Sequence, residues 1–413
     1  MTVPHDTERR RPEVALVQAG LGSGGTEKVL ARLAAHLAGR GYGITMVSIH
    51  GDPQAPYYPV PDTVHLRSME AERGAAAANS TRQRIAWLRM VLRDRDLALS
   101  CLTKINVQTA LATAGLGVRR IASERNNFKR QKMNPLWRWS MPFALATADR
   151  VVMQTAAARD ALPRWAMRRS VIVPNPVPDP NAAAFEAPTN QIVAVGRLTA
   201  QKGFDTLLRA LAIARDRGHP MPLTLYGVGE LRDQLIGLSR SLNLQELAHF
   251  AGRSKVPHGW ANRPSIFVLS SRFEGFPNVL IEAMAAGFAV VSTRCDWGPS
   301  EIVTSGTDGL LVAMDDPDAM ADALIRLHED TALRARLATS ARVRAADYAE
   351  ARVMEHWESV IVDALTSRIS GPSLHTTGGG AHLHNGSTTQ SPVKEYPGGG
   401  RVASTGSAPC PPR

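Results

Sequence analysis

Residues 270–287 read SSRFEGFPNVLIEAMAAG and directly follow a short, branched apolar run at residues 265–269. Such a run predicts a buried parallel strand, and the residues after Pro277 predict a helix. Proline suits the first helical turn because it has no N–H to leave unsatisfied, and Gly287 suits the position just past the helix end. The stretch therefore predicts a strand–loop–helix unit of a parallel α/β sheet.

Two carboxylates of this unit can face one ligand: Glu274 in the loop and Glu282 one turn into the helix. The amides of Asn278, Val279 and Leu280 are expected to be unsatisfied and to point at the same place, where the helix dipole favours an anion. Carboxylates accept hydrogen bonds from sugar hydroxyls and amides bind phosphate, so the pattern favours a polyhydroxylated anionic ligand. The alternative is that Glu282 is a solvated residue at a helix start and that Glu274 is an unrelated loop charge. We would favour this alternative if the sequence had either glutamate alone, but not when it has both in one loop framed by Gly and Pro.

The spacing E-x7-E within EGFPNVLIEAMAAG resembles the signature of the retaining glycosyltransferases of family 4, which have the GT-B fold. The resemblance covers roughly residues 13–366 and is more specific in the second half. It is strongest to the bacterial branch that builds exopolysaccharides, O-antigens and lipid-linked oligosaccharides with galactose or N-acetylhexosamines. It implies an α/β chain with two Rossmann-like domains whose parallel sheets face a central cleft.

The length of 413 residues fits two domains, and strands that alternate with helices predict parallel sheets covered on both faces. The proline run PNPVPDP after residue 173 resembles the interdomain connector of the fold, and the last segment is too rich in Gly, Ser, Thr and Pro to order itself. With the resemblance, the expected parts are a disordered start (1–12), an acceptor-side domain (13–174), a nucleotide-sugar domain (175–350), a helix crossing back to the first domain (351–366) and a disordered tail (367–413).

Composition points to the cytoplasm. No stretch approaches the roughly 20 apolar residues that span a bilayer, and residues 1–12 lack the apolar core of a signal peptide. The cysteines are three, an odd number without metal-ligand spacing, as expected of a reducing compartment. Cys101 and Cys295 lie in or beside apolar runs and are expected to be packed thiols.

Residues 20–25 read GLGSGG between the first predicted strand and its helix, which matches the G-x-G-x-x-G dinucleotide fingerprint, and Asp52 follows the next strand. Against a nicotinamide cofactor, the third glycine opens the helix directly and Asp52 lies in a Gly-Asp-Pro turn. The GGTE loop with Gly24 and Gly25 resembles the family loop that faces the donor diphosphate, where glycines let phosphate oxygens approach the amides. A nucleotide-dependent oxidoreductase that uses residues 20–25 stays the alternative.

Glu124 and Arg125 follow a predicted strand in the sequence SERN, so their side chains are expected to point into the cleft. Many family members carry a histidine in this region that lines the acceptor site, and SERN is similar to the exopolysaccharide branch instead. Either residue is a candidate for contact with the acceptor or the transferred sugar. A purely structural pairing of Glu124 with Arg125 is an equally good interpretation.

Gly196, Arg197 and Lys202 belong to GRLTAQKGF, a loop that follows the predicted strand 192–195. Arg197 and Lys202 can converge on one anion, and fixed cations stabilise a pyrophosphate leaving group most strongly in the transition state. The pattern G-R-L-x-x-x-K-G-F also resembles the diphosphate clamp of the family. The alternative for Arg197 and Lys202 is that they are two unrelated cations on a surface loop. In relatives the loop after the glycine of HFAGR holds the nucleotide base, which makes Arg253 a donor-binding candidate.

Residues 119–170 carry 12 Lys or Arg but 3 Asp or Glu, interleaved with Trp137, Trp139, Phe143 and Trp165. Basic and aromatic residues together suit an anionic membrane surface. Nucleic acid is the competing partner, but no helix-turn-helix, RNP-type or zinc signature accompanies the segment. A solvated surface that is merely rich in Arg is as good an interpretation. We therefore expect a cytoplasmic protein, and if the segment does bind membranes, we expect it to associate peripherally with the inner face of the cell membrane.

The resemblance implies a metal-independent, retaining hexosyltransferase without a resident cofactor. It would move a hexose or N-acetylhexosamine from a UDP-sugar to a saccharide acceptor, polyprenyl-diphosphate-linked, in cell-surface polysaccharide or glycan biosynthesis. Arg197, Lys202 and the helix amides would hold the diphosphate, Glu282 the ribose and Glu274 the transferred sugar. Two D-x-D triplets, at 94–96 and 316–318, precede a strand and cap a helix, and we expect neither to hold a metal. A GDP-mannose-using mannosyltransferase of the same fold and a catalytically silent sugar-nucleotide sensor are the remaining alternatives.

Overall fold

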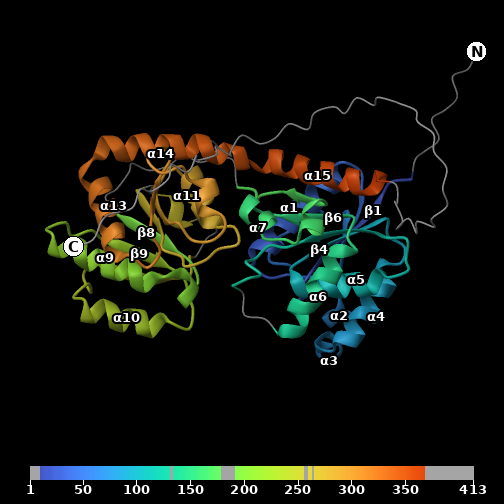
Figure 1. The fold of residues 1–413 in the computed structure, drawn as a ribbon. Helices are drawn as coiled ribbons and strands as arrows, with labels where there is room; N and C mark the ends of the chain where they lie inside the picture. The colour runs from blue at the N-terminus through green and yellow to red at the C-terminus, as the bar shows by residue number, and fades with distance from the viewer. Residues whose placement is uncertain (1–9, 131–133, 178–190, 255–258, 263–264, 368–413) are drawn as a thin grey trace, which may run out of the picture. The chain divides into compact units, whose positions relative to one another are not determined.

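The computed structural model describes residues 10–130, 134–177, 191–254, 259–262 and 265–367, all of which belong to one compact unit. The disorder expected at residues 1–12 and 367–413 therefore falls almost wholly outside the described residues. Two all-parallel sheets organise the unit, one built from residues before 173 and one from residues after 191 (Figure 1).

The first sheet has seven strands in the order β3-β2-β1-β4-β5-β6-β7. In the centre, Val14 of β1 pairs with Ile44 of β2 on one side and Leu97 of β4 on the other. The strands are β1 (Glu13–Gln18), β2 (Gly43–Ser48), β3 (Val64–Ser68), β4 (Leu97–Cys101), β5 (Arg119–Ser123), β6 (Arg150–Met153) and β7 (Ser170–Ile172). The helices of this half are α1 (Gly25–Gly39), α2 (Met69–Arg73), α3 (Ala75–Asn79), α4 (Thr81–Leu92), α5 (Thr103–Thr113), α6 (Pro135–Ala146), α7 (Ala156–Asp160) and α8 (Arg164–Met167).

The second sheet has six strands in the order β10-β9-β8-β11-β12-β13, the doubly wound order of a dinucleotide-binding fold. The strands are β8 (Ile192–Val195), β9 (Leu223–Tyr226), β10 (Ala248–Gly252), β11 (Ile266–Leu269), β12 (Ala289–Thr293) and β13 (Leu310–Val312). The helices are α9 (Phe204–Asp216), α10 (Arg232–Ser241), α11 (Asn278–Ala285), α12 (Pro299–Ile302), α13 (Pro317–Glu329), α14 (Thr331–Ala345) and α15 (Glu350–Thr366). Three short 3₁₀ turns complete the described elements: η1 (Ala200–Lys202), η2 (Gly259–Ala261) and η3 (Ala346–Tyr348).

Both sheets are buried on both faces because alternate residues of each central strand point to opposite layers of helices. In β1, Val14 and Leu16 pack with α1, whereas Ala15 and Val17 pack with α4. In β8, Ile192 and Ala194 pack with α9 and α13, and the opposite face of that sheet packs with α11. This two-faced burial explains why the strands read as continuous apolar runs in the sequence.

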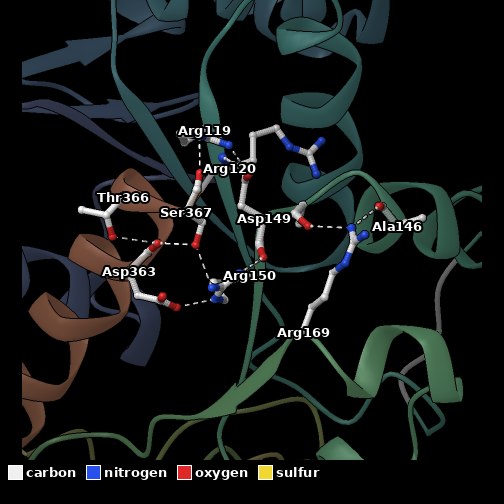
Figure 2. A network of polar contacts seen from close by, with 10 residues as sticks. Arg119, Arg120, Ala146, Asp149, Arg150, Arg169, Asp363, Thr366 and Ser367 are labelled. Atoms are coloured by element: carbon white, nitrogen blue, oxygen red, sulfur yellow. Dashed lines mark hydrogen bonds and ion pairs between the residues drawn. The ribbon is translucent and has the colours of Figure 1, made fainter. Parts of the chain in front are cut away.

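The last helix, α15, packs on the core of the first sheet although it follows the second sheet in the chain. Its buried Trp357 and Ile361 belong to the same apolar cluster as Leu16 and the inner face of α1. Figure 2 shows polar contacts at its C-terminal end, where Asp363 pairs with Arg150 at the start of β6. Among the described residues, no helix has the length and apolar character needed to cross a membrane.

Candidate active site

A cavity of about 860 Å³ opens at the carboxyl ends of the strands of both sheets. Each sheet reverses its strand order next to its first strand, between β1 and β4 and between β8 and β11, and such switch points leave a crevice for ligands. The lining therefore comes from loops far apart in the chain. Among the candidates named from the sequence, the lining includes Gly24, Gly25, Arg125, Gly196, Arg197, Lys202, Arg253, Glu274, Asn278 and Val279.

Glu274 is buried at the cavity wall in the loop between β11 and α11. Its Oε1 accepts hydrogen bonds from Lys202 Nζ at 2.7 Å and from Ser271 Oγ at 2.6 Å. Lys202 is the last residue of the turn η1 after β8, so two neighbouring strands of the second sheet deliver the two charges to one place. A buried carboxylate paired in this way is held in one orientation toward the cavity.

Glu282 lies one turn into α11 and is paired with Lys28 of α1, with 3.0 Å between Glu282 Oε1 and Lys28 Nζ. The ion pair joins a helix of the first half to a helix of the second half. Glu282 is not among the cavity-lining residues, although its neighbours Asn278 and Val279 are. Lys28 is a residue that the sequence interpretation missed, and its position in GGTEK, next to the glycine loop, is the only signal that could have indicated it.

The start of α11 corrects one expectation from the sequence. Pro277 is the residue before the helix rather than within its first turn, and the amides of Asn278 and Leu280 donate to the carbonyls of Phe276 and Pro277 at 3.0 and 2.9 Å. The expectation of three unsatisfied amides is therefore wrong for these two, because the chain tightens into short-range bonds around the proline. Gly287, with φ +85°, lies just past the helix end as predicted.

The glycine loop before α1 faces the start of α11. Gly25 is the first residue of α1, and a Cβ built on it would lie 2.9 Å from Asn278 Nδ2, so a larger residue would require the Asn278 side chain to shift. Asp52 accepts from the Gln54 amide within its own turn and does not line the cavity. Asp52 therefore does not take the position that the acidic residue of a dinucleotide fingerprint has beside the bound nucleotide.

Arg125 and Glu124 are both buried at the end of β5, but their side chains have different partners. Thr103 Oγ1 donates to Glu124 Oε2 at 2.5 Å, and the Arg125 guanidinium donates to Asn175 Oδ1. Gln154 Nε2 donates to the same oxygen at 2.7 Å. Burial raises the pKa of Glu124 to about 7 and lowers the pKa of Arg125. The pairing of the two side chains with each other, which the sequence left open, is therefore not the arrangement found.

Asn175 connects the two halves and was not among the site residues predicted from the sequence. It lies in the PNP connector, accepts from Arg125, and its Nδ2 donates to Asn278 Oδ1. Asn126, which follows Arg125, also lines the cavity. An isolated asparagine between prolines was the only signal for Asn175 in the sequence.

The acidic triplets have structural partners. Asp96 Oδ2 accepts from the Glu13 amide at 2.7 Å, and Asp316 Oδ1 accepts from the Ala319 amide at 2.9 Å at the start of α13. Cys101 and Cys295 are buried, and burial raises the pKa of each thiol to about 12. Such thiols remain protonated near neutral pH and are poor nucleophiles.

Comparison with known proteins identifies the family. A model described as glycosyl transferases group 1 matches residues 189–330, and one described as Glycosyltransferase Family 4 matches residues 23–179. The chain belongs to this family of glycosyltransferases. The two matched regions fall on the two sheets, so the resemblance noted from EGFPNVLIEAMAAG is confirmed for both halves of the glycosyltransferase.

Relatives of the glycosyltransferase cover most of its length. The amylovoran biosynthesis glycosyltransferase AmsD of Erwinia amylovora is 26% identical over 76% of this chain and 90% of its own. An α-1,4-N-acetyl-D-galactosaminyltransferase of Campylobacter jejuni, named for the acceptor GalNAc-α-(1→4)-GalNAc-α-(1→3)-diNAcBac-PP-undecaprenol, is 25% identical over 79% of this chain and 91% of its own. The structure of Anabaena HepE with UDP and glucose has a TM-score of 0.71 at 18% identity, covering 84% of this chain and 99% of HepE. The expected GT-B fold is thereby confirmed.

The glycosyltransferase thus brings most of its sequence-predicted site residues to one cavity. Glu274, Lys202 and Arg197 lie there together with the glycine loop of the first half. Glu282 does not line the cavity and is paired with Lys28 instead. The Glu124 carboxylate and Leu280 are buried and do not line the cavity either.

Proposed function

We propose that this glycosyltransferase moves a hexose or an N-acetylhexosamine from a UDP-sugar to a saccharide acceptor, with retention of configuration. The observation that carries the proposal is the pair Lys202–Glu274, with 2.7 Å between Nζ and Oε1, on the wall of a cavity shared by both halves. One member of the pair suits a phosphate and the other suits sugar hydroxyls. Such a pair is adapted to a ligand in which a sugar is joined directly to a phosphate.

The donor would exchange the partners of the charged groups. Its diphosphate binds Lys202 and Arg197, together with the amide of Val279, a cavity-lining residue at the start of α11 whose neighbours Asn278 and Leu280 already donate their amides to backbone carbonyls. Glu274, relieved of Lys202, accepts from hydroxyls of the transferred sugar. Glu282 accepts from the ribose hydroxyls once Lys28 moves away, and the loop containing Gly24 and Gly25 closes over the phosphates. Arg253 lies on the wall where the base is expected.

The transfer step breaks the bond between the sugar C1 and the phosphate oxygen, and the electron pair leaves with UDP. Lys202 and Arg197 stabilise the negative charge that grows on that oxygen, which lowers the barrier more than it tightens ground-state binding. The acceptor oxygen attacks C1 from the face that UDP leaves and gives its proton to the departing phosphate. These cations supply the charge, and we propose that the reaction needs neither a metal nor a resident cofactor.

We further propose that the acceptor is a polyprenyl-diphosphate-linked saccharide and that the product serves cell-surface polysaccharide or glycan biosynthesis. The support comes from the relatives, since the Campylobacter enzyme is named for an undecaprenol-linked acceptor and the Erwinia enzyme for an exopolysaccharide. A GDP-mannose-using mannosyltransferase is the second candidate within this fold. A panel of UDP-sugars and GDP-mannose with one lipid-linked acceptor separates the two.

Replacement of the central carboxylate tests the proposal. We expect Glu274→Gln to lower the transfer rate by at least about a hundredfold, because the amide keeps the size but loses the charge that orients the sugar and balances Lys202. Glu246→Gln is the matched control, since Glu246 is exposed between α10 and β10. Transfer is measured with radiolabelled UDP-sugars, and unfolding curves of both variants report folding. Wild-type transfer by Glu274→Gln would contradict the assignment.

Nucleotide binding separates the transferase from an oxidoreductase. Titration with UDP, GDP, ADP, NAD and NADP in the presence of EDTA is expected to show selective stabilisation by UDP that Arg197→Ala weakens. Stabilisation by NAD or NADP alone would move the site to the glycine loop before α1. Donor binding without transfer to any saccharide would instead indicate a sugar-nucleotide sensor.

A further inference from the structure

Helix α6 exposes large apolar side chains on one face. Leu136, Trp139 and Phe143 follow one another at helical spacing, and Trp139 is 83% exposed and Leu136 68% exposed. The opposite face of α6, with Met141 and Leu145, is buried in the first half. The helix is thus apolar on both faces, although only one of them packs against the protein.

The neighbouring helix α8 contacts α6 and exposes a further aromatic side chain. Ala166 of α8 packs in the same buried cluster as Met141 and Leu145 of α6, while Trp165 is exposed. Figure 2 shows Arg169, just after α8, reaching the end of α6, where Arg169 Nη1 donates to the Ala146 carbonyl at 3.1 Å. We call the exposed side chains Leu136, Trp139, Phe143 and Trp165, with the exposed arginines of the same two helices, the α6–α8 face.

The charge of the α6–α8 face is positive. Arg138 on α6, Arg164 at the start of α8 and Arg168 just after it are exposed. The surrounding segment, residues 119–170, has 12 basic and 3 acidic residues. Its acidic residues are Glu124, which is buried, and Asp149 and Asp160, which pair with Arg119 and Arg159. No acidic side chain of this segment is therefore left to oppose an anionic partner of the face.

We propose that the α6–α8 face docks on the surface of an anionic lipid bilayer. Tryptophans prefer the boundary between headgroups and acyl chains, where Trp139 and Trp165 would lie, with Leu136 and Phe143 reaching the first acyl carbons. The exposed arginines meet the lipid phosphates and pass their stems along the apolar boundary. Val343 on α14 and Val362 on α15 are also exposed apolar residues, but both lie outside the basic segment 119–170.

Vesicle flotation with the full chain at low salt tests the proposal. We expect the protein to float with vesicles of phosphatidylcholine and phosphatidylglycerol and much less with phosphatidylcholine alone. The double variant Trp139→Ser/Phe143→Ser is expected to lose at least about tenfold in partitioning, since it removes two large buried contacts with the bilayer. Arg164→Ser/Arg168→Ser is expected to lose the preference for the anionic vesicles.

The control variant Val343→Ser/Val362→Ser removes two exposed apolar side chains outside the α6–α8 face and is expected to bind vesicles as the wild type does. UDP binding is measured on all variants and is expected to stay unchanged, so a loss of flotation is distinguished from a failure of the donor site. Equal flotation of the wild type and the Trp139→Ser/Phe143→Ser variant would overturn the proposal. The proposal would also be overturned if the wild type were a dimer, and if Trp139→Ser/Phe143→Ser dissociated that dimer without changing flotation. The α6–α8 face would then bind a second copy of the chain.

Discussion

Glu124 is a carboxyl group buried at the end of β5. The Thr103 hydroxyl donates to one of its oxygens at 2.5 Å, and the Arg125 amide donates to the other at 3.2 Å. Loss of hydration outweighs these bonds and raises the pKa of Glu124 from its ordinary value of 4.5 to about 7. The folded chain therefore keeps a proton on this group at pH values where the unfolded chain has already lost it.

This difference makes stability depend on pH. We expect the free energy of unfolding to fall as the pH rises from 4.5 to about 7, because the folded state binds the extra proton throughout this window. The contribution of Glu124 is about 3 kcal/mol at most. Below pH 4.5 Glu124 is protonated in both the folded and the unfolded state, so the free energy of unfolding keeps its full value. Above about pH 7 Glu124 is ionised in both states, and its contribution to stability has been lost completely.

Urea unfolding of the wild type and of Glu124→Gln across this pH range measures the effect. The other ionisable groups are common to both proteins, so the difference between the two stability curves isolates Glu124. The wild type is expected to lose stability relative to the variant as the pH rises. Parallel curves would show that Glu124 titrates at an ordinary pKa.

Strands and helices were largely predictable from apolar patterns. Strand β8 has the bounds 192–195 expected from the sequence, because it is a branched apolar run that is buried on both faces of the sheet. The edge strand β3 was not predicted, since only Val64 and Ser68 at its two ends are buried and the strand carries Arg67. Packing on one face only gives a weaker sequence signal than packing on two.

Helix α15 corresponds to the helix predicted at residues 351–366, and its Trp357 is completely buried. We expect Trp357→Ala to lower the free energy of unfolding by about 3–5 kcal/mol, because the cavity left in the core of the first half cannot close fully. Val362→Ala, at an exposed position of the same helix, is the control and is expected to change it by less than about 0.5 kcal/mol. Denaturant unfolding compares them, and equal midpoints would show that α15 is not anchored by Trp357.

At the scale of the whole molecule, the backbones of the two halves lie close together at Gly275. A Cβ built on this residue would lie 2.9 Å from the Cα of Asn126 and 3.1 Å from the Arg125 carbonyl oxygen. Those are backbone atoms of the first half, so they cannot step aside as a flexible side chain could. Gly275 follows Glu274 directly, and any shift here moves that carboxylate relative to the acceptor side.

We expect Gly275→Ala to lower the transfer rate at saturating substrate by at least about tenfold, since even a small displacement between reacting groups is costly. UDP affinity is expected to change much less, because most of its proposed contacts lie in the second half. Gly237→Ala is the matched control: it lies on an exposed turn of α10, where an added Cβ meets nothing within 4 Å. Transfer at the wild-type rate by Gly275→Ala would show that the two halves accommodate the added Cβ without displacing Glu274.

Contacts across the cavity were the part that the sequence could not predict. Motif spacing places Glu282, Lys202 and Glu274 at strand ends and helix starts, because those positions follow from the local elements. The partner of Glu282 is Lys28, which lies in the other half of the chain, and the link from Asn175 to Asn278 depends in the same way on how the two sheets face each other. No local pattern records that orientation.

The two lysine–glutamate pairs also affect how an anionic donor is first attracted. The charges of Lys202 and Lys28 are already neutralised by carboxylates at 2.7 and 3.0 Å, so they exert little pull on a molecule still in solution. Among the described residues, Arg197 and Arg253 on the cavity wall have no such carboxylate partner. The arginines would therefore govern the rate of encounter and its sensitivity to ionic strength, while the lysines act only after contact and set how long the donor stays.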